Sequence, residues 1–161
     1  MKKLTLIRHA EAANPTLSQS DFDRPLTAYG QHQAEEMGKL LAEQNFSFDQ
    51  MFTSTAQRAL STANTINSAL LSNTPAPIEE AQLYNIAADQ LYHFIEMLDD
   101  DISHAVIIAH NPGLSYLVND LLRQPLPSMT PCTAVQLQLN ISEWVEIHPG
   151  CAQLLSHDTP H

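Results

Sequence analysis

Short apolar segments that alternate with stretches of helical spacing constrain the fold of this chain more than any other feature. Three segments are apolar enough to be buried strands, and they run from Leu4 to Ile7, from Phe48 to Thr53 and from His104 to Ala109. The last contains three consecutive β-branched residues, a pattern typical of a strand that is buried on both faces of a parallel sheet. Strands that alternate with helices predict an α/β fold, here a three-layer α/β/α sandwich with a mostly parallel sheet.

Helical spacing of apolar residues follows each of the three strand segments. Thr27 is expected to cap the first helix, and Ser54 or Thr55 to cap the second. Asn111 can cap a later helix with Pro112 at its first position, where a missing N–H costs nothing. These helices would cover the two faces of the sheet.

The remaining segments complete the predicted fold. The polar stretch from Asn14 to Arg24 is expected to be an unstructured loop, and Ile78 to Leu83 a short strand. Apolar spacing from Leu91 to Leu98 predicts a helix. Alternation in Val135 to Leu139 and in Trp144 to Ile147 predicts a closing hairpin.

Length and charge limit the classes of protein to which the chain can belong. Its 161 residues, 43% of them hydrophobic, suit one domain spanning residues 1–161. The formal net charge of −11 should repel nucleic acids and anionic membrane surfaces. We therefore expect neither as a partner, and we expect a monomer.

The chain shows no signal for export or for a membrane. The apolar run near the N-terminus is too short for a signal peptide, and no segment approaches the length of a membrane span. A cytoplasmic protein is therefore expected. Cys132 and Cys151 form no CxxC motif, so two free thiols are expected, with a single disulfide as the alternative.

Basic and nucleophilic side chains directly follow the predicted strands. Arg8 and His9 follow the first strand, Arg58 lies early in the helix after the second, and His110 ends the third. Side chains beyond the carboxyl ends of parallel strands converge in one crevice. Each of these residues alone could be an ordinary exposed side chain, but their joint occurrence predicts a site for a dianion such as a phosphoryl group.

Each residue of this predicted site has a plausible chemical role. A neutral imidazole such as that of His9 can attack phosphorus, and nearby guanidiniums would lower its pKa and favour the neutral form. Arg58 would present a planar fork to two phosphate oxygens near a helix N-terminus, which itself favours anions. His110 could donate a hydrogen bond to a phosphoryl oxygen.

Four motifs in the chain resemble those of a known family. RHAEA at residues 8–12 resembles the RHG signature of the histidine phosphatase superfamily, also called the phosphoglycerate mutase-like superfamily. STAQRALSTA at residues 54–63 and AHNP at residues 109–112 are similar to its other two motifs. DFDRPLTAYG at residues 21–30 resembles a segment of the small SixA-type phosphohistidine phosphatases. The resemblance covers nearly the whole chain.

The resemblance implies a role for each matching residue. His9 would be the phosphate-accepting nucleophile, Arg8 and Arg58 would clamp the phosphoryl oxygens, and His110 would complete the site. Arg24, in the R-P-L-T segment, would contact the substrate. The implied fold is the phosphoglycerate mutase-like sandwich.

The chain departs from the family pattern at two positions. Ala10 replaces the glycine after the histidine, so the backbone there should not need a positive φ. Asn85 stands where many members carry a carboxylic acid, and an amide cannot be a general acid. Asp21 and Asp23 could instead reach in from their loop. An alkoxide leaving group needs a proton donor, whereas the imidazole of phosphohistidine needs less help.

These observations lead to one functional hypothesis and two alternatives. The hypothesis is a metal-independent phosphohistidine phosphatase without a cofactor, because flanking arginines oppose a metal cation. The resemblance implies a protein substrate such as a histidine-containing phosphotransfer domain in signal transduction. The alternatives are a small-molecule phosphomonoesterase of the same superfamily and a non-enzymatic phosphate-binding module.

Overall fold

Six strands form one sheet in the order β3-β2-β4-β1-β5-β6 in the computed structural model, which describes residues 1–70 and 74–160. The strands are β1 (Lys2–Arg8), β2 (Gln50–Thr53), β3 (Ile78–Glu79), β4 (His104–Ala109), β5 (Ala134–Leu139) and β6 (Ala152–Asp158). β1, β4, β2 and β3 are mutually parallel, whereas β5 and β6 are antiparallel to their neighbours. The sheet is therefore mostly parallel, as predicted.

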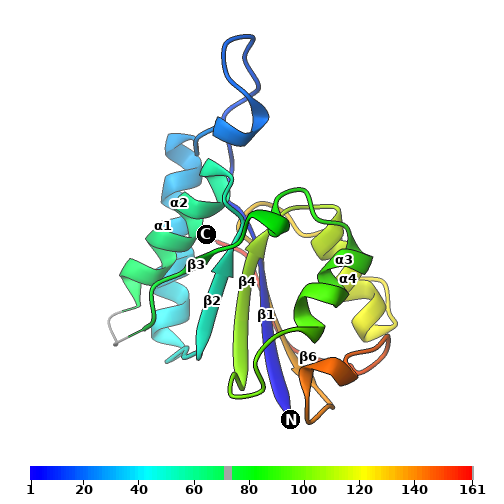
Figure 1. Ribbon diagram of the computed structural model, residues 1–161. Coiled ribbons are helices and arrows are strands. Elements are labelled where there is room, and N and C mark those ends of the chain that lie inside the picture. The colour runs from blue at the N-terminus through cyan, green and yellow to red at the C-terminus, as the bar shows by residue number, and fades with distance from the viewer. Residues whose placement is uncertain (71–73, 161) are drawn as a thin grey trace.

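Four helices cover the two faces of this sheet (Figure 1). They are α1 (Ala28–Glu43), α2 (Gln57–Ala69), α3 (Ala88–Glu96) and α4 (Gly113–Leu122). Alternate residues of β4 divide between two cores, because successive side chains of a strand point to opposite faces. Val106 and Ile108 join the core under α1 and α2, and Ile107 joins the core under α3 and α4. The predicted three-layer α/β/α sandwich, phosphoglycerate mutase-like in its arrangement, is confirmed.

Several predicted helix boundaries are confirmed and two are wrong. Thr27 caps α1 and accepts a hydrogen bond from the backbone N–H of Gly30 at 2.9 Å. α2 begins at Gln57 with Ala56 as its cap, so neither Ser54 nor Thr55 caps it. The hydroxyl of Ser54 is engaged elsewhere, as described below.

The start of α4 also differs from the prediction. Pro112 is the N-cap residue and Gly113 the first helical residue. The side chain of Asn111 nevertheless accepts a hydrogen bond from the backbone N–H of Ser115 at 3.2 Å. Asn111 therefore satisfies one free N–H of the first turn without being the cap by position.

The predicted C-terminal hairpin is wrong in its second strand. Residues Trp144–Glu146 form a turn of 3₁₀ helix, and β5 pairs instead with β6. The predicted strand from Ile78 to Leu83 is shorter than expected, because β3 ends at Glu79 and a 3₁₀ turn follows at Ala81–Leu83. The predicted helix from Leu91 to Leu98 corresponds to α3.

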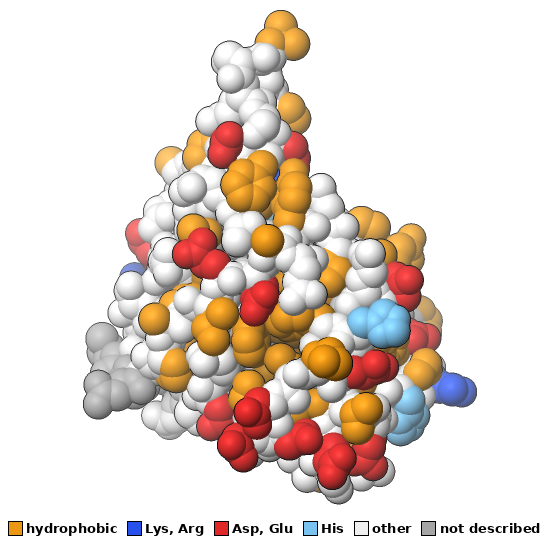
Figure 2. All heavy atoms as spheres, in the orientation of Figure 1, with side chains coloured by type: hydrophobic (Ala, Val, Ile, Leu, Met, Phe, Trp, Pro, Cys, Tyr) orange, Lys and Arg blue, Asp and Glu red, His pale blue; other side chains and the backbone are white. Residues whose placement is uncertain are grey.

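Residues 13–26, here called the arm, project beyond the carboxyl ends of the parallel strands between β1 and α1 (Figures 1 and 2). A β-bridge joins Ala12 to Leu26 at the base of the arm, and a second joins Thr16 to Gln19 near its tip. A 3₁₀ turn occupies Asp21–Asp23. The arm is therefore more ordered than the unstructured loop expected from its polar sequence.

Two further predictions can be compared with the structure. Cys132 and Cys151 are free and buried, so the expected free thiols are confirmed. Within residues 1–70 and 74–160, no helix is both long enough and apolar enough to cross a membrane.

Candidate active site

The register of the two central strands brings His9 and His110 together. β1 and β4 are parallel neighbours in which Arg8 pairs with Ala109, so the next residue of each strand is a histidine. The backbone N–H of His9 extends this ladder by donating to the Ala109 carbonyl at 3.2 Å. The two ring centroids lie 5.2 Å apart.

The position of the pair follows from the topology. The chain leaves β1 toward α1 on one face and leaves β4 toward α4 on the other face. Such a topological switch point, at the carboxyl ends of parallel strands, is where open α/β sheets bind ligands.

The imidazole of His9 is held in one orientation by the backbone. Its Nδ1 lies 2.7 Å from the carbonyl oxygen of Ala10, which can only accept, so Nδ1 carries the proton. Nε2 is therefore the ring nitrogen with a free lone pair. The side chain is buried, with 9% of the residue exposed, so its ring has little freedom to turn.

The imidazole of His110 is fixed through its other nitrogen. Its Nε2 lies 2.8 Å from the hydroxyl of Ser54, which already accepts from the backbone N–H of Ala56 at 3.2 Å. The network is satisfied when the hydroxyl donates to Nε2, which places the ring proton on Nδ1. Nδ1 is buried and has no hydrogen-bond partner among the residues that the structure describes. It is therefore a donor available to a ligand oxygen.

Two guanidiniums lie close to these imidazoles. Arg58, the second residue of α2, is 4% exposed. Arg8 donates from Nη1 to the carbonyl oxygen of Met129 at 2.9 Å, while its buried Nε has no hydrogen-bond partner within residues 1–70 and 74–160. The structure thus brings together four of the predicted site residues, namely Arg8, His9, Arg58 and His110, here called the histidine–arginine cluster.

Arg24, the fifth predicted residue, lies at the edge of the cluster and is tied to the arm. It donates from Nε to the carbonyl oxygen of Ala13 at 2.7 Å and from Nη1 to Oδ1 of Asp21 at 2.9 Å. Arg24 is near enough to His9 to lower the pKa of that imidazole by charge repulsion. Its position suits a contact with a bound anion once Asp21 moves.

Asp21 provides a carboxylate at the place where an anion would bind. Its Oδ2 accepts from Nη2 of Arg58 at 3.0 Å and from the hydroxyl of Tyr84 at 2.6 Å. Its backbone carbonyl accepts from Nη1 of Arg58 at 2.7 Å. These donors hold the pKa of Asp21 well below its usual range, with Tyr84 and Arg24 contributing most. The carboxyl group is therefore ionised and is unsuited to act as a general acid.

Burial keeps both histidines neutral. Burial is the largest cause of the lowering of the pKa of His9 to about 4. The hydrogen bond to Ala10 opposes this lowering, and the charges of Arg58, Arg8 and Arg24 add to it. Burial likewise lowers the pKa of His110 to about 3, with additional lowering by His9 and Arg58. At neutral pH both rings are uncharged, and Nε2 of His9 keeps its lone pair.

We expect the two histidines of the ligand-free protein to titrate far below pH 6.5. Because protonation removes the lone pair of His9 Nε2, the nucleophilic form is complete at pH 7, persists at pH 5 and is lost as pH falls through about 4. Titration of ¹⁵N-labelled imidazoles by NMR measures the two midpoints directly. A midpoint of 6.5 or higher for either ring would contradict the assignment.

Three residues whose contacts sequence reasoning missed support the cluster. The hydroxyl of Thr62 accepts from the backbone N–H of Ala10 at 3.0 Å and donates to the carbonyl of Arg58 at 2.7 Å. It therefore joins the loop of His9 to the first turns of α2. The ring of Tyr84 packs edge-on to His110, with centroids 5.6 Å apart. Ser54 orients His110, as described above. The contacts of Thr62 with Ala10, of Tyr84 with His110 and of Ser54 with His110 have no local sequence signal, because the partners are far apart in the chain.

The structure also accommodates the residues at the two positions where the chain departs from the family pattern, Ala10 and Asn85. Ala10 is fully buried and is absent from the residues with positive φ, so its methyl group is accommodated as expected. Gly30, by contrast, cannot be replaced without movement, because a Cβ there would lie 2.0 Å from the carbonyl oxygen of Glu11. Asn85 has a φ of 52°, a conformation that asparagine tolerates better than most residues.

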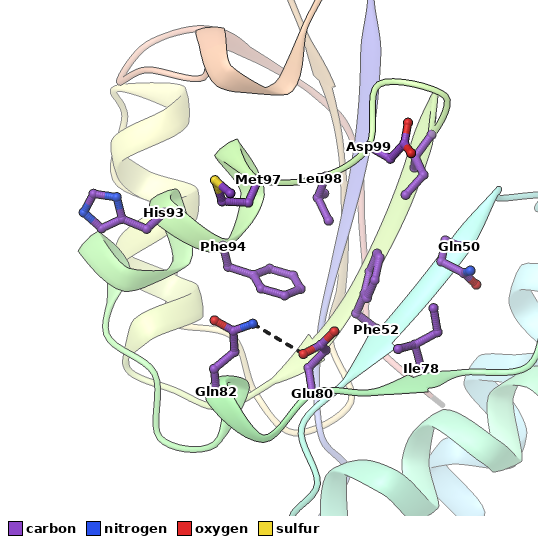
Figure 3. A pocket seen from close by; sticks show the side chains of 11 residues that line it. Gln50, Phe52, Ile78, Glu80, Gln82, His93, Phe94, Met97, Leu98 and Asp99 are labelled. Carbon is purple, nitrogen blue, oxygen red and sulfur yellow. Dashed lines mark hydrogen bonds between the residues drawn. The ribbon is translucent and has the colours of Figure 1, made fainter.

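A large cavity lies away from the histidine–arginine cluster. It has a volume of about 620 Å³ and lies beside β2, β3 and α3 (Figure 3). Its floor is apolar, and Phe52 and Phe94 pack edge to face within it at 5.4 Å. None of the five predicted site residues lines it. The cavity therefore plays no part in the candidate active site.

A sequence profile of the histidine phosphatase superfamily, branch 1, matches residues 4–86 of the chain. The chain therefore belongs to this superfamily. Over 70 residues it is 41% identical to a 2,3-bisphosphoglycerate-dependent phosphoglycerate mutase of Treponema pallidum. This match covers 42% of the chain and only 28% of the mutase, so the chain aligns with about a quarter of that relative's length.

Solved structures share the fold over nearly the whole chain. The protein histidine phosphatase SixA complexed with tungstate has a TM-score of 0.81 and 22% identity, and the alignment covers 98% of this chain and 97% of that one. A protein of Agrobacterium tumefaciens that is provisionally named phosphohistidine phosphatase SixA has the same TM-score, 24% identity and 99% coverage of both chains. At these identities the likeness establishes the shared fold.

Proposed function

We propose that this chain is a phosphatase that removes the phosphoryl group from phosphohistidine on a protein, through a phospho-His9 intermediate. The observation that carries the proposal is the fixed, neutral imidazole of His9. Its Nδ1 proton is held by the Ala10 carbonyl, so Nε2 is left as the nucleophile. His110 and the guanidiniums of Arg8 and Arg58 lie beside it, where they can bind phosphoryl oxygens.

The reaction proceeds in two in-line displacements. In the first, Nε2 of His9 attacks phosphorus, the P–N bond of the substrate breaks, and the substrate imidazole leaves with the bonding electron pair. In the second, water attacks the phosphorus of phospho-His9, the new P–N bond breaks, and inorganic phosphate leaves. His110 Nδ1–H donates to a phosphoryl oxygen in both steps, where negative charge must be stabilised.

In the part of the chain that the structure describes, the cluster has no suitable proton donor, and this favours a P–N bond over an alkyl ester as the bond that is broken. The carboxylate that contacts Arg58 is Asp21, which is ionised and already shared among three donors. Asn85 cannot supply a proton. An alkoxide leaving group requires protonation, whereas the ring of phosphohistidine leaves as neutral imidazole when it is already protonated. The name of the SixA neighbours, which refers to phosphohistidine, is consistent with this choice.

No metal ion is required in this mechanism. Three guanidiniums, those of Arg8, Arg24 and Arg58, lie near enough to His9 to act on its charge, and they attract an anion and oppose a divalent cation. The partner we propose is a protein that carries phosphohistidine, such as a histidine-containing phosphotransfer domain of a signalling relay.

Substrate comparison tests the proposal. With a chelator present, we expect the kcat/KM for phosphohistidine, on a protein or as the free amino acid, to exceed that for an alkyl phosphate by at least about 100-fold. That factor is the lower end of what a missing general acid costs. A preference for the alkyl ester would instead indicate a small-molecule phosphomonoesterase. Binding of tungstate without any turnover would indicate a phosphate-binding module.

A further inference from the structure

The tip of the arm exposes a leucine completely. Leu17 lies in the turn that the Thr16–Gln19 bridge closes, and its relative exposure is 111%. Figure 2 shows a hydrophobic side chain at the outer end of the arm, with mostly backbone and other uncharged side-chain atoms between that end and the body. A single exposed apolar side chain is common on protein surfaces, so the arm requires independent observations before a role can be inferred.

The first such observation is that the arm is held rigidly at its base. A β-bridge joins Ala12 to Leu26, and the backbone N–H of Ala13 donates to the Pro25 carbonyl at 2.8 Å. Arg24 also donates to the Ala13 carbonyl on the opposite side of the arm. A projecting segment that is already ordered loses little conformational entropy on binding a partner, and such preorganisation favours affinity.

The second observation is that an aromatic surface connects the arm to the histidine–arginine cluster. Phe22, which is 37% exposed, packs edge-on to Tyr84 with ring centroids 5.2 Å apart. Tyr84 in turn packs edge-on to His110 at 5.6 Å. Leu17 is four positions before Asp21, so the Cα atoms of the two residues lie at most about 14 Å apart. A phosphate on a small molecule would not reach Leu17, but one on a folded protein would bring other surface groups against it.

We propose that the arm is the docking surface for the protein that carries the phosphohistidine, with Leu17 and Phe22 as its apolar anchors. This inference rests on the proposed function. The partner would be a folded protein with an apolar patch beside its phosphohistidine, within reach of the arm. Leu17 would bury its side chain in that patch while the phosphoryl group enters the cluster. Burial of a fully exposed leucine side chain against a partner removes apolar area from water and so favours association.

The variant L17D tests the proposal, with L17A as a milder second variant and M97D as the matched control. Met97 is 85% exposed, but it follows α3 and lines the cavity of Figure 3 rather than the arm. We expect L17D to raise the KM for a phosphohistidine protein at least about tenfold, the change expected when one leucine can no longer be buried. The kcat for that protein and all constants for free phosphohistidine should stay at the wild-type values. M97D should match the wild type on both substrates.

The outcomes separate the docking proposal from the proposed function. If the wild type hydrolyses the phosphohistidine protein and neither Leu17 variant changes its KM, the docking proposal is wrong and the function stands. If the wild type turns over neither the protein nor free phosphohistidine, both are wrong. If L17D also loses activity on free phosphohistidine, its fold or site is disturbed. In that case the L17A variant decides whether the docking proposal holds. The proposal requires L17A to raise the KM for the phosphohistidine protein and to leave the constants for free phosphohistidine unchanged.

Discussion

Replacement of His9 by alanine is expected to abolish phosphoryl transfer. The substitution removes Nε2, the atom proposed to attack phosphorus, and no nearby group can replace it, because the only other imidazole in the cluster has its Nε2 bonded to Ser54. The loss in kcat should reach about 10⁴-fold or more, as is typical when a covalent nucleophile is removed. The H9A variant should also fail to acquire an acid-labile label from a radioactive phosphodonor, whereas the wild type should acquire it.

The matched control for this variant is H93A. The side chain of His93 lies on α3 and is 79% exposed, so its removal tests the loss of an imidazole away from the cluster. H93A should keep wild-type activity and labelling. Substantial turnover by H9A, or labelling of the chain at another residue, would show that the proposed intermediate is wrong.

Removal of the Arg58 guanidinium is expected to have the next largest effect. Arg58 contributes a positively charged guanidinium with two N–H donors to the cluster, and its charge helps to lower the pKa of His9. R58A should therefore reduce kcat/KM by roughly 10²- to 10³-fold, the range seen when one transition-state donor is lost. R58K should lie between the wild type and R58A, because lysine keeps the charge but lacks the planar pair of donors.

Two measurements separate a catalytic effect of R58A from a structural one. Tungstate affinity should fall together with kcat/KM, because the same guanidinium would bind both anions. Urea unfolding should show whether the fold persists, since Asp21 keeps its bonds to Arg24 and Tyr84. K39A, which removes a cation whose side chain is 66% exposed on α1, should change neither quantity. Wild-type tungstate binding by R58A would contradict the proposed role.

The sequence predicted those elements whose pattern is determined by burial. β4 runs over His104–Ala109 as expected, because both faces of that strand are covered and nearly all its residues are apolar. The second strand of the C-terminal hairpin was predicted wrongly because the true strand has few buried residues. β6 is an edge strand with mostly exposed residues, so it has no strong apolar alternation. Trp144 and Ile147 do enter the core, but from a 3₁₀ turn and the residue after it. Their separation of three positions is one turn of a 3₁₀ helix, whereas alternation in a strand has a period of two.

The sequence also located the residues of the candidate site, but not the contacts that orient them. His9 and His110 were predicted to meet because each follows a parallel strand, and the structure brings them together. Their ring orientations depend on Ala10 and Ser54. The engagement of Asp21 with Arg58 and Tyr84 joins residues more than 35 positions apart, so it could be inferred only from the folded chain.

The shared ladder of β1 and β4 has a consequence for how this scaffold can diversify. Both histidines extend directly from two hydrogen-bonded interior strands, so no hinge lies between them and their spacing cannot widen without breaking the sheet. The space between the rings is therefore restricted to a group of one size. The molecule to which that group is attached can still differ between relatives. Such differences must be accommodated by the connections from β1 to α1 and from β4 to α4, which can lengthen or shorten while the strands stay in register.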